Sequence, residues 1–260
     1  MKIKKLNILV LSLVLFAGSI ISGAELTGLQ IVENVYNRDT GKDSKGNLTM
    51  SLINSQGNER VRTIKQFVKD FGKVEKKIMF FMSPADVRNT SFVNWSYTEE
   101  GKDDDQWIYL PALKKVKRIS SDSKSDYFMG SDFTYDDLGD RQPKADKHKL
   151  LREEKFNGEQ CYVVESVPKD EDYMYSRTVT WIIKDKWIGL KKEFYDEDEE
   201  LLKILSVKKF EKINGLWIIL QSEMVNVQKK HTTKMKLSEV KINTGIPNRQ
   251  FTERMMKRGL

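Results

Sequence analysis

The chain runs Trp107-Ile108-Tyr109-Leu110-Pro111-Ala112-Leu113, then Arg118-Ile119-Ser120, then Phe128-Met129-Gly130-Ser131-Asp132-Phe133-Thr134-Tyr135-Asp136-Asp137-Leu138. These stretches predict an aromatic strand, a basic segment and a short helix over 133–138 that Ser131 or Asp132 can cap. None of them contains a catalytic constellation. The combination favours binding of an apolar molecule over its chemical transformation.

Strand patterns dominate the rest of the chain. Residues 26–36 repeat apolar side chains at a helical period, but an alternation of period two begins at Asn47. Two of the polar turns between strand candidates are Asn-Gly pairs, at Asn157 and Asn214, which favour hairpins. About eleven strands follow in sequence order, over 77–82, 91–97, 106–110, 115–119, 149–156, 160–167, 177–184, 190–195, 202–210, 216–227 and 232–242.

This pattern predicts an α+β protein of mainly antiparallel β structure. So many strands with short connections rarely stay in one flat sheet, so we expect a strongly curved or partly closed one. A last short helix is expected over 250–256. No Ser/Gly/Pro-rich linker interrupts the chain, which favours a single domain over 25–260.

The N-terminus has the features of a secretory signal peptide over residues 1–24. Lysines at 2, 4 and 5 precede an apolar run over 6–21, and Ser22-Gly23-Ala24 supplies small residues for cleavage after Ala24. The run is short for a bilayer span, so a retained anchor is the less favoured alternative. We expect the mature protein to begin at residue 25 and to lie beyond the membrane it crossed.

The charge balance argues against a dedicated nucleic-acid binder. The formal net charge is +7, and three of these charges are signal-peptide lysines, so acidic and basic residues nearly balance elsewhere. Local basic clusters occur at Lys114, Lys115, Lys117 and Arg118, and again over 254–258. They are either solvated surface or docking sites for anionic headgroups or an acidic partner.

The residues that usually perform catalysis or bind metals are sparse. His148 and His231 stand alone, Cys161 is the single cysteine, and no zinc, phosphate-loop or nucleophile-elbow motif is present. The acidic runs over 103–105 and 196–200 lack the spacing of a calcium loop and fit solvated hairpin turns. The sequence therefore predicts no enzyme activity, no cofactor and no metal site.

Aromatic and methionine side chains are the remaining resource. Each one is most simply a core residue, but a curved sheet has a concave face that three short helices do not fill. Flexible methionines suit a surface that adapts to acyl chains of varying shape. The candidate cavity residues are Phe80, Trp107, Tyr109, Phe128, Met129, Phe133, Tyr135, Trp181, Ile183, Met235 and Leu237.

Four stretches carry a resemblance to a known family: Met82-Ser83-Pro84-Ala85-Asp86-Val87-Arg88-Asn89-Thr90, and the segments 107–113, 118–120 and 128–135. They resemble the bacterial outer-membrane lipoprotein-sorting protein family, relatives of the periplasmic carrier LolA. The likeness covers nearly all of the mature chain, including 181–195 and 245–251. Asn89 stands where the family pattern has glycine, but asparagine tolerates a positive φ.

The resemblance implies an incomplete antiparallel barrel around a hydrophobic cavity lidded by helices. It also implies a periplasmic carrier that moves acyl chains of lipoproteins or lipids between an inner-membrane transporter and an outer-membrane acceptor. The alternative is an accessory subunit of an RND-type exporter, with Lys114 to Arg118 docking the partner. An enzyme acting on envelope lipids ranks third, because no nucleophile–base pair is visible.

Overall fold

One sheet of thirteen antiparallel strands forms the body of the protein in the computed structural model, which describes residues 25–260. The predicted signal peptide lies outside the described residues. The strands are β1 (Asp43–Ile53), β2 (Glu59–Asp70), β3 (Val74–Ser83), β4 (Ser91–Tyr97), β5 (Asp105–Leu110), β6 (Lys115–Arg118), β7 (Asp146–Phe156), β8 (Glu159–Pro168), β9 (Arg177–Ile183), β10 (Gly189–Tyr195), β11 (Leu201–Ile213), β12 (Leu216–Asn226) and β13 (His231–Ile242).

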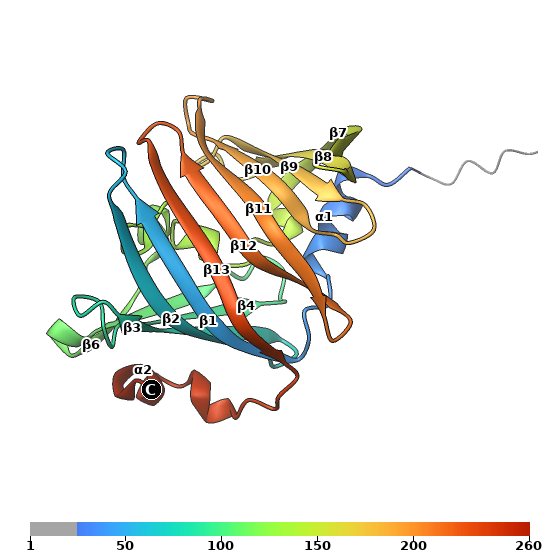
Figure 1. Cartoon of the computed structure of the whole chain (residues 1–260). Coiled ribbons are helices and arrows are strands. Elements are labelled where there is room, and N and C mark those ends of the chain that lie inside the picture. The colour runs from blue at the N-terminus through green and yellow to red at the C-terminus, as the bar shows by residue number, and fades with distance from the viewer. Residues whose placement is uncertain (1–24) are drawn as a thin grey trace, which may run out of the picture.

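The sheet curls strongly but does not close. Its strand order is β6-β5-β4-β3-β2-β1-β13-β12-β11-β10-β9-β8-β7, so β1 and β13 from opposite ends of the chain pair at its centre. Strands β6 and β7 are its two edges, and Figure 1 shows the open, curved arrangement. The predicted unclosed, mainly antiparallel barrel is confirmed. Strands β3 to β13 match the eleven expected ranges, and β1 and β2 lie where the alternation of period two begins.

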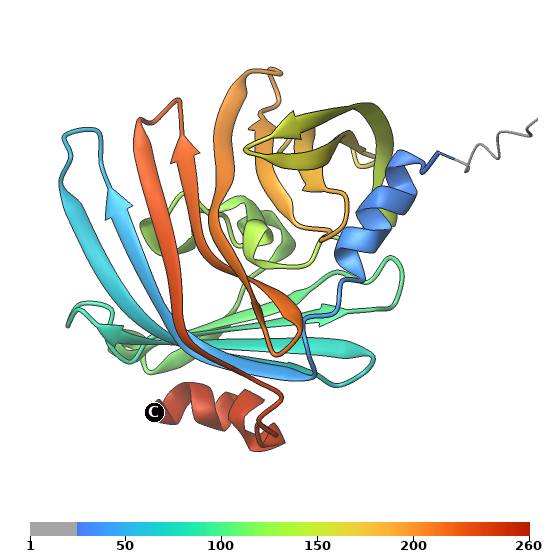
Figure 2. The same cartoon turned by 45° about the vertical axis from the view of Figure 1, so that its right-hand side comes forward.

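Residues 119–145 join the two edges and run along the concave side of the sheet (Figure 2). We call residues 126–141 the plug segment. The predicted helix over 133–138 is wrong, because only Asp136–Leu138 form a single 3-10 turn. The Thr134 amide donates to the Asp137 carboxylate (2.7 Å) and the Asp137 amide donates to the Thr134 hydroxyl (3.1 Å), as in a capping box, but the helix stops after this one turn because the chain is extended at Gly139. The 3-10 turns are η1 (Pro111–Leu113), η2 (Ser121–Ser125), η3 (Phe128–Gly130), η4 (Asp136–Leu138), η5 (Pro143–Ala145) and η6 (Asn248–Phe251).

The two α-helices lie on opposite faces of the sheet. Helix α1 (Gly28–Tyr36) starts with a capping box, in which Thr27 and Gln30 exchange hydrogen bonds, and its Ile31 packs on Val164 and Ile182. Helix α2 (Glu253–Arg258) starts later than expected because Thr252 is its N-cap. No helix within residues 25–260 is long and apolar enough to cross a membrane.

Residues 244–258, which we call the C-terminal segment, cover the convex face of β3 to β6 (Figures 1 and 2). Its Ile246, Phe251 and Met256 are buried against Phe67 and Ile78 of the sheet. This packing makes the C-terminal segment part of the folded core.

Candidate ligand-binding cavity

A cavity of about 690 Å³ opens on the concave side of the sheet. Strands β10, β11 and β12 contribute Phe194, Leu205 and Met224 to its lining, and α1 contributes Val32 and Val35. The rest of the wall comes from the plug segment, from the residues before β9 and from single positions on β1 to β4 and β7 to β9. Pockets that hold small ligands measure about 300–1,000 Å³, so this cavity has room for one.

Buried polar contacts fix the plug segment to the sheet. The Asp132 carboxylate accepts from the Thr233 hydroxyl and lies beside His231 Nδ1, both at 2.7 Å. Lys203 is completely buried, and its ammonium donates to the Asp137 carboxylate (2.5 Å) and to the Asp132 carbonyl oxygen (3.1 Å). Buried charges persist where they are paired, so these contacts define one docked position for the plug segment.

Two tyrosines and an arginine continue this network along the cavity wall. Tyr173 donates its hydroxyl to Asp136, and Tyr175 donates to Asp137 (3.0 Å). Arg141 stacks on the Tyr173 ring, 3.6 Å from its centroid, and binds both oxygens of Asp146. Burial, followed by the neighbouring aspartates, raises the pKa of both tyrosine hydroxyls, so they remain hydrogen-bond donors.

The cavity lining also contains two ionisable groups of opposite sign. Burial raises the pKa of the Glu75 carboxyl above its usual range, although Lys77 opposes the shift. Burial lowers the pKa of the Lys192 ammonium, against the attraction of Asp137, Asp146 and Asp136. The cavity is therefore amphipathic, with apolar side chains beside charged groups.

A second cavity of about 320 Å³ lies on the other side of residues 137–140. Its apolar lining comes from Met79, Leu138, Met235 and Leu237, among others. Residues Asp137, Gly139 and Asp140 line both cavities. The plug segment therefore divides the concave face into two compartments, and its displacement would join them.

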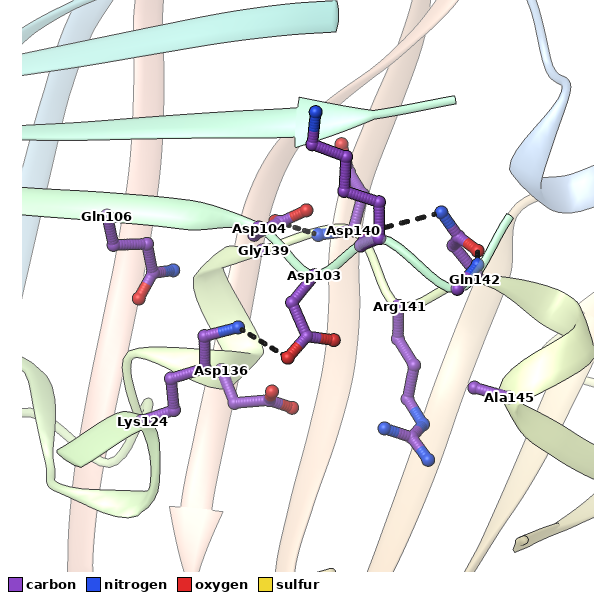
Figure 3. Close-up of a pocket in the computed structure, with 12 residues that line it drawn as sticks. Asp103, Asp104, Gln106, Lys124, Asp136, Gly139, Asp140, Arg141, Gln142 and Ala145 are labelled. Atoms are coloured by element: carbon purple, nitrogen blue, oxygen red, sulfur yellow. Dashed lines mark hydrogen bonds and ion pairs between the residues drawn. The ribbon is translucent and has the colours of Figure 1, made fainter. Parts of the chain in front are cut away.

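A third, smaller space of about 100 Å³ adjoins the same part of the plug segment (Figure 3). Asp104 accepts hydrogen bonds here from Asn94, Ser96 and the Asp140 amide, and burial nevertheless raises its pKa. Lys124 points at Asp103, as Figure 3 shows. The described residues contain no group of three or more His, Cys, Asp or Glu side chains placed to hold a metal ion. The acidic run over 103–105 thus supports the loops around the cavity.

Six of the predicted cavity residues lie together on the concave side. They contribute to one apolar cluster that also holds Met50, Phe81 and Phe92. Within it, the Phe128 ring lies 5.0 Å from Phe92, centroid to centroid. The six are Phe128, Met129, Phe133, Tyr135, Met235 and Leu237. Of these, Phe133 lines the larger cavity, and Met235 and Leu237 line the second.

The structure places the other five predicted residues on the convex face. Phe80, Trp107 and Tyr109 pack beneath the C-terminal segment, in a cluster with Phe251 and Met256. Trp181 and Ile183 belong to another cluster, where the Lys191 ammonium lies 4.3 Å from the centre of the Trp181 ring. Strand register explains this placement, because Ile108 pairs with Phe92 of the concave face and so turns its neighbour Trp107 outward.

Sequence reasoning missed the residues that line the larger cavity from α1 and from β10 to β12. The sequence pattern predicts a helix around Val32 and strands around Phe194, Leu205 and Met224. It does not predict that these side chains face the cavity. Lys192 was missed because a single lysine in a β-strand normally indicates a solvated position. The same parity of Lys192 and Phe194 is the one signal for the strand's inward face, whereas Leu190 lies at a register shift and packs in the cluster of Trp181.

The basic residues predicted to dock a partner are exposed on the edge of the sheet. Lys114 lies in the turn after η1, and Lys115, Lys117 and Arg118 belong to β6. Arg118 forms an ion pair with Asp105, whereas the three lysines form no ion pair with any described residue. Leu113 beside them is 62% exposed. This turn therefore presents free positive charge next to an apolar side chain.

Known protein structures resemble this chain over most of its length. A family model described as "Uncharacterized protein" matches residues 73–258. A domain from Vibrio parahaemolyticus, assigned to outer membrane lipoprotein sorting, is 36% identical, with a TM-score of 0.83 over 89% of this chain and 98% of that one. A DUF1329 family protein from Desulfovibrio piger is 33% identical, with a TM-score of 0.82 over 88% of this chain and 97% of that one.

The fold extends to a more distant structure. A LolA superfamily protein from Nitrosomonas europaea is 20% identical, with a TM-score of 0.67 over 88% of this chain and 99% of that one. No curated protein matches the chain. The unclosed sheet is the fold of the LolA superfamily structure, and the chain belongs to the family of outer membrane lipoprotein-sorting protein domains.

Proposed function

We propose that this protein is a periplasmic carrier, which binds acyl chains of a lipoprotein or lipid on its concave face and delivers them toward the outer membrane. The observation that carries the proposal is the cavity of about 690 Å³ enclosed by α1, the sheet and the plug segment. Each buried methylene contributes about 0.8 kcal/mol, so burial of part of a chain is enough for useful affinity.

The division of the concave face supports reversible loading. A long acyl chain that occupies both compartments must displace residues 137–140, of which Asp137, Gly139 and Asp140 line both. The contacts that hold the plug segment combine the buried aromatic rings of Phe128 and Phe133 with polar contacts such as the ion pair between Lys203 and Asp137. Ligand binding therefore competes with plug docking, which keeps affinity moderate and allows release to an acceptor.

A lipid-extraction experiment tests the proposal directly. The protein is purified from its native host without detergent, and its bound lipids are extracted and measured by mass spectrometry. The carrier function predicts acylated molecules in the wild-type protein. Leu205→Trp fills the larger cavity with a bulky side chain and is expected to remove most of the bound lipid. Tyr109→Trp, on the convex face, is the matched control and is expected to retain it.

The folded state of the variants decides the interpretation. Circular dichroism and thermal unfolding establish that Leu205→Trp remains folded, with Met224→Trp as a second cavity-filling variant. Equal lipid content in wild type and in both folded cavity variants would contradict the proposal. Wild-type protein that neither carries native lipid nor takes up added acyl chains would do so as well.

We further propose that the turn around Lys114, Lys115, Lys117 and Arg118 docks the partner, either an inner-membrane transporter or an outer-membrane acceptor. The support is the set of three unpaired lysines beside exposed Leu113. Charged residues at the rim of an interface mainly accelerate its association, and these lysines would do so for an acidic partner. Replacement of the three lysines by glutamate should therefore lower cross-linking to envelope proteins in cells, whereas glutamate at Lys147, Lys149 and Lys155 of the opposite edge should not. Equal loss in both triple variants would contradict this site.

A further inference from the structure

Lys192 is the basic residue of the larger cavity that has no hydrogen-bond or ion-pair partner, whereas Arg38 and Arg141 both have one. It lies on β10 between the outward-facing Lys191 and Glu193, which form an ion pair with each other (2.6 Å). Lys192 itself lines the cavity next to Phe194, and its side chain is exposed only in part. Among the described residues, no oxygen lies within hydrogen-bonding or ion-pairing distance of its ammonium.

The carboxylates that raise the pKa of Lys192 already have hydrogen-bond or ion-pair partners of their own. Asp137 binds Lys203 and the Tyr175 hydroxyl. Asp146 is held by both guanidinium contacts of Arg141, and Asp136 accepts from Tyr173. These carboxylates raise the pKa of Lys192, but burial has the larger effect and lowers it. The Lys192 ammonium is thus partly withdrawn from water, near the Phe194 ring and without an oxygen partner, and an anion that enters the cavity would supply one.

The acids on the facing part of the lining do not provide this partner. Asp70 caps its own turn by accepting from the Gly72 amide (2.6 Å), and Asp140 belongs to the plug segment between the two cavities. Burial raises the pKa of Glu75, which weakens its tendency to carry charge. Lys192 is instead flanked by Phe194, Leu205 and Met224, which are suited to an alkyl chain.

We infer that the cavity binds an amphiphile with a single anionic head, whose oxyanion pairs with Lys192 while its alkyl chain lies along Phe194, Leu205 and Met224. The inference rests on the proposed carrier function and narrows its cargo. It assigns the site to an anionic lipid, with a carboxylate or a phosphate head, in preference to the uncharged acyl anchor of a lipoprotein. Lys192 is the residue that specifies the head, and the apolar lining accepts the chain.

Titration with three probes of equal chain length tests this inference. Dodecanoate, dodecyl phosphate and dodecanol share the alkyl chain but differ in the head, and each is titrated calorimetrically below its micellar concentration. A charge-assisted hydrogen bond in a buried site should make at least one anionic probe bind about tenfold or more tightly than dodecanol. Preference for dodecanoate would identify the carboxylate source, and preference for dodecyl phosphate the phosphate source.

Three variants assign that preference to Lys192. Lys192→Gln should reduce the affinity for the anionic probes to that for dodecanol and leave dodecanol binding unchanged. Lys192→Arg should retain the preference. Lys191→Gln, one residue away on the convex face, is the matched control and should behave as wild type. Removal of an unpaired, partly buried charge should not unfold the protein, and thermal unfolding of each variant checks this.

The outcomes separate this inference from the function on which it rests. If all three probes bind wild type with equal affinity, the anionic-head inference is overturned and the acyl-chain carrier stands. If Lys192→Gln and Lys191→Gln weaken anionic binding equally, Lys192 is not the specifying residue and the inference is likewise overturned. If no probe binds the folded wild-type protein, both the inference and the proposed carrier function fail.

Discussion

Lys203 shows how one residue can hold an extended segment in place. It is the one lysine of the described residues that is fully buried, and it contacts the plug segment through Asp132 and Asp137. Tyr127, Tyr175 and Phe194 surround its ammonium with aromatic rings at 5.1 to 5.8 Å from the centroids. The residue therefore couples β11 to the plug segment by charge, within an otherwise aromatic environment.

Removal of this lysine should be strongly destabilising. Lys203→Ala leaves the Asp137 carboxylate buried without its partner, so we expect the free energy of unfolding in urea to fall by about 3–5 kcal/mol. The control is Lys208→Ala, because Lys208 pairs with Glu223 at a half-exposed position and exposed pairs contribute about 0–1 kcal/mol. Similar losses in the two variants would show that the Lys203 pair does not hold the plug segment.

The buried carboxyl group of Glu75 makes the stability of the protein depend on pH. Its folded-state pKa lies above that of an unfolded glutamate, about 4.3, so ionisation disfavours the folded state. Stability from this group is greatest below the unfolded pKa and decreases as the pH rises through the folded pKa. Glu75→Gln should therefore be more stable than wild type at pH 7, and the two should converge near pH 4. Urea unfolding at both pH values measures the difference; a constant gap would refute the assignment.

The elements that the sequence predicts well are those whose pattern is local. Alternation of side chains and the turns at Asn157 and Asn214 suffice for strands β3 to β13, because neighbours in sequence pair in space. The plug segment is different, since its conformation depends on Lys203 and Thr233, which lie about seventy to one hundred residues away in sequence. No local propensity contains that information, and the expected helix at 133–138 fails for this reason.

The face of each strand residue was equally beyond local reasoning. Trp107 and Tyr109 look like cavity residues in isolation, yet the register between β4 and β5 directs them to the C-terminal segment. Register shifts also occur in four strand pairs: β2–β3, β7–β8, β10–β11 and β11–β12. Each shift changes which side chains of the strand point to the concave face. The sequence therefore predicted the aromatic surplus but not its division between a concave cavity and a convex core.

Asp43 connects the C-terminal segment to the sheet, and it predicts acid-sensitive docking of this element. Burial alone would raise its pKa, but hydrogen bonds from the Thr244, Gly245 and Ile246 amides and the Thr244 hydroxyl outweigh burial and lower it. A lowered carboxyl pKa gives stability that is present above the unfolded value of about 3.9 and is lost as the pH falls through the folded value.

Replacement of this carboxylate should reproduce the acid effect at neutral pH. Asp43→Asn keeps the size of the side chain but removes its charge and one acceptor, so we expect a loss of about 1–3 kcal/mol at pH 7. The difference from wild type should shrink as the pH approaches 3. Asp39→Asn, whose carboxylate accepts from the Gly41 amide in an exposed turn, is the control and should have little effect. A difference independent of pH would rule out the carboxylate as the cause.

At the scale of the whole molecule, the two faces of the sheet have different roles. The convex face is closed by the C-terminal segment, whose contacts are apolar and continuous with the core. The concave face is covered by α1 and by the plug segment, which leaves cavities of about 690 and 320 Å³ on its two sides. Because unfilled volume lies on both sides of the plug segment, we expect the concave cover to be the part of the fold that opens most readily.

Hydrogen exchange should therefore separate the two covers. Backbone amides of the plug segment are expected to exchange at a lower opening free energy than those of β1 and β13, which pair along nine positions at the centre of the sheet. Addition of dodecanoate should change exchange in the plug segment and α1 and leave the C-terminal segment unaffected, because only the first two elements line the cavity. Equal changes in both covers would indicate general stabilisation by ligand, and a plug segment that exchanges as slowly as β1 would show that it does not open ahead of the sheet. Selective change on the concave side would identify the plug segment and α1 as the elements that a bound chain displaces.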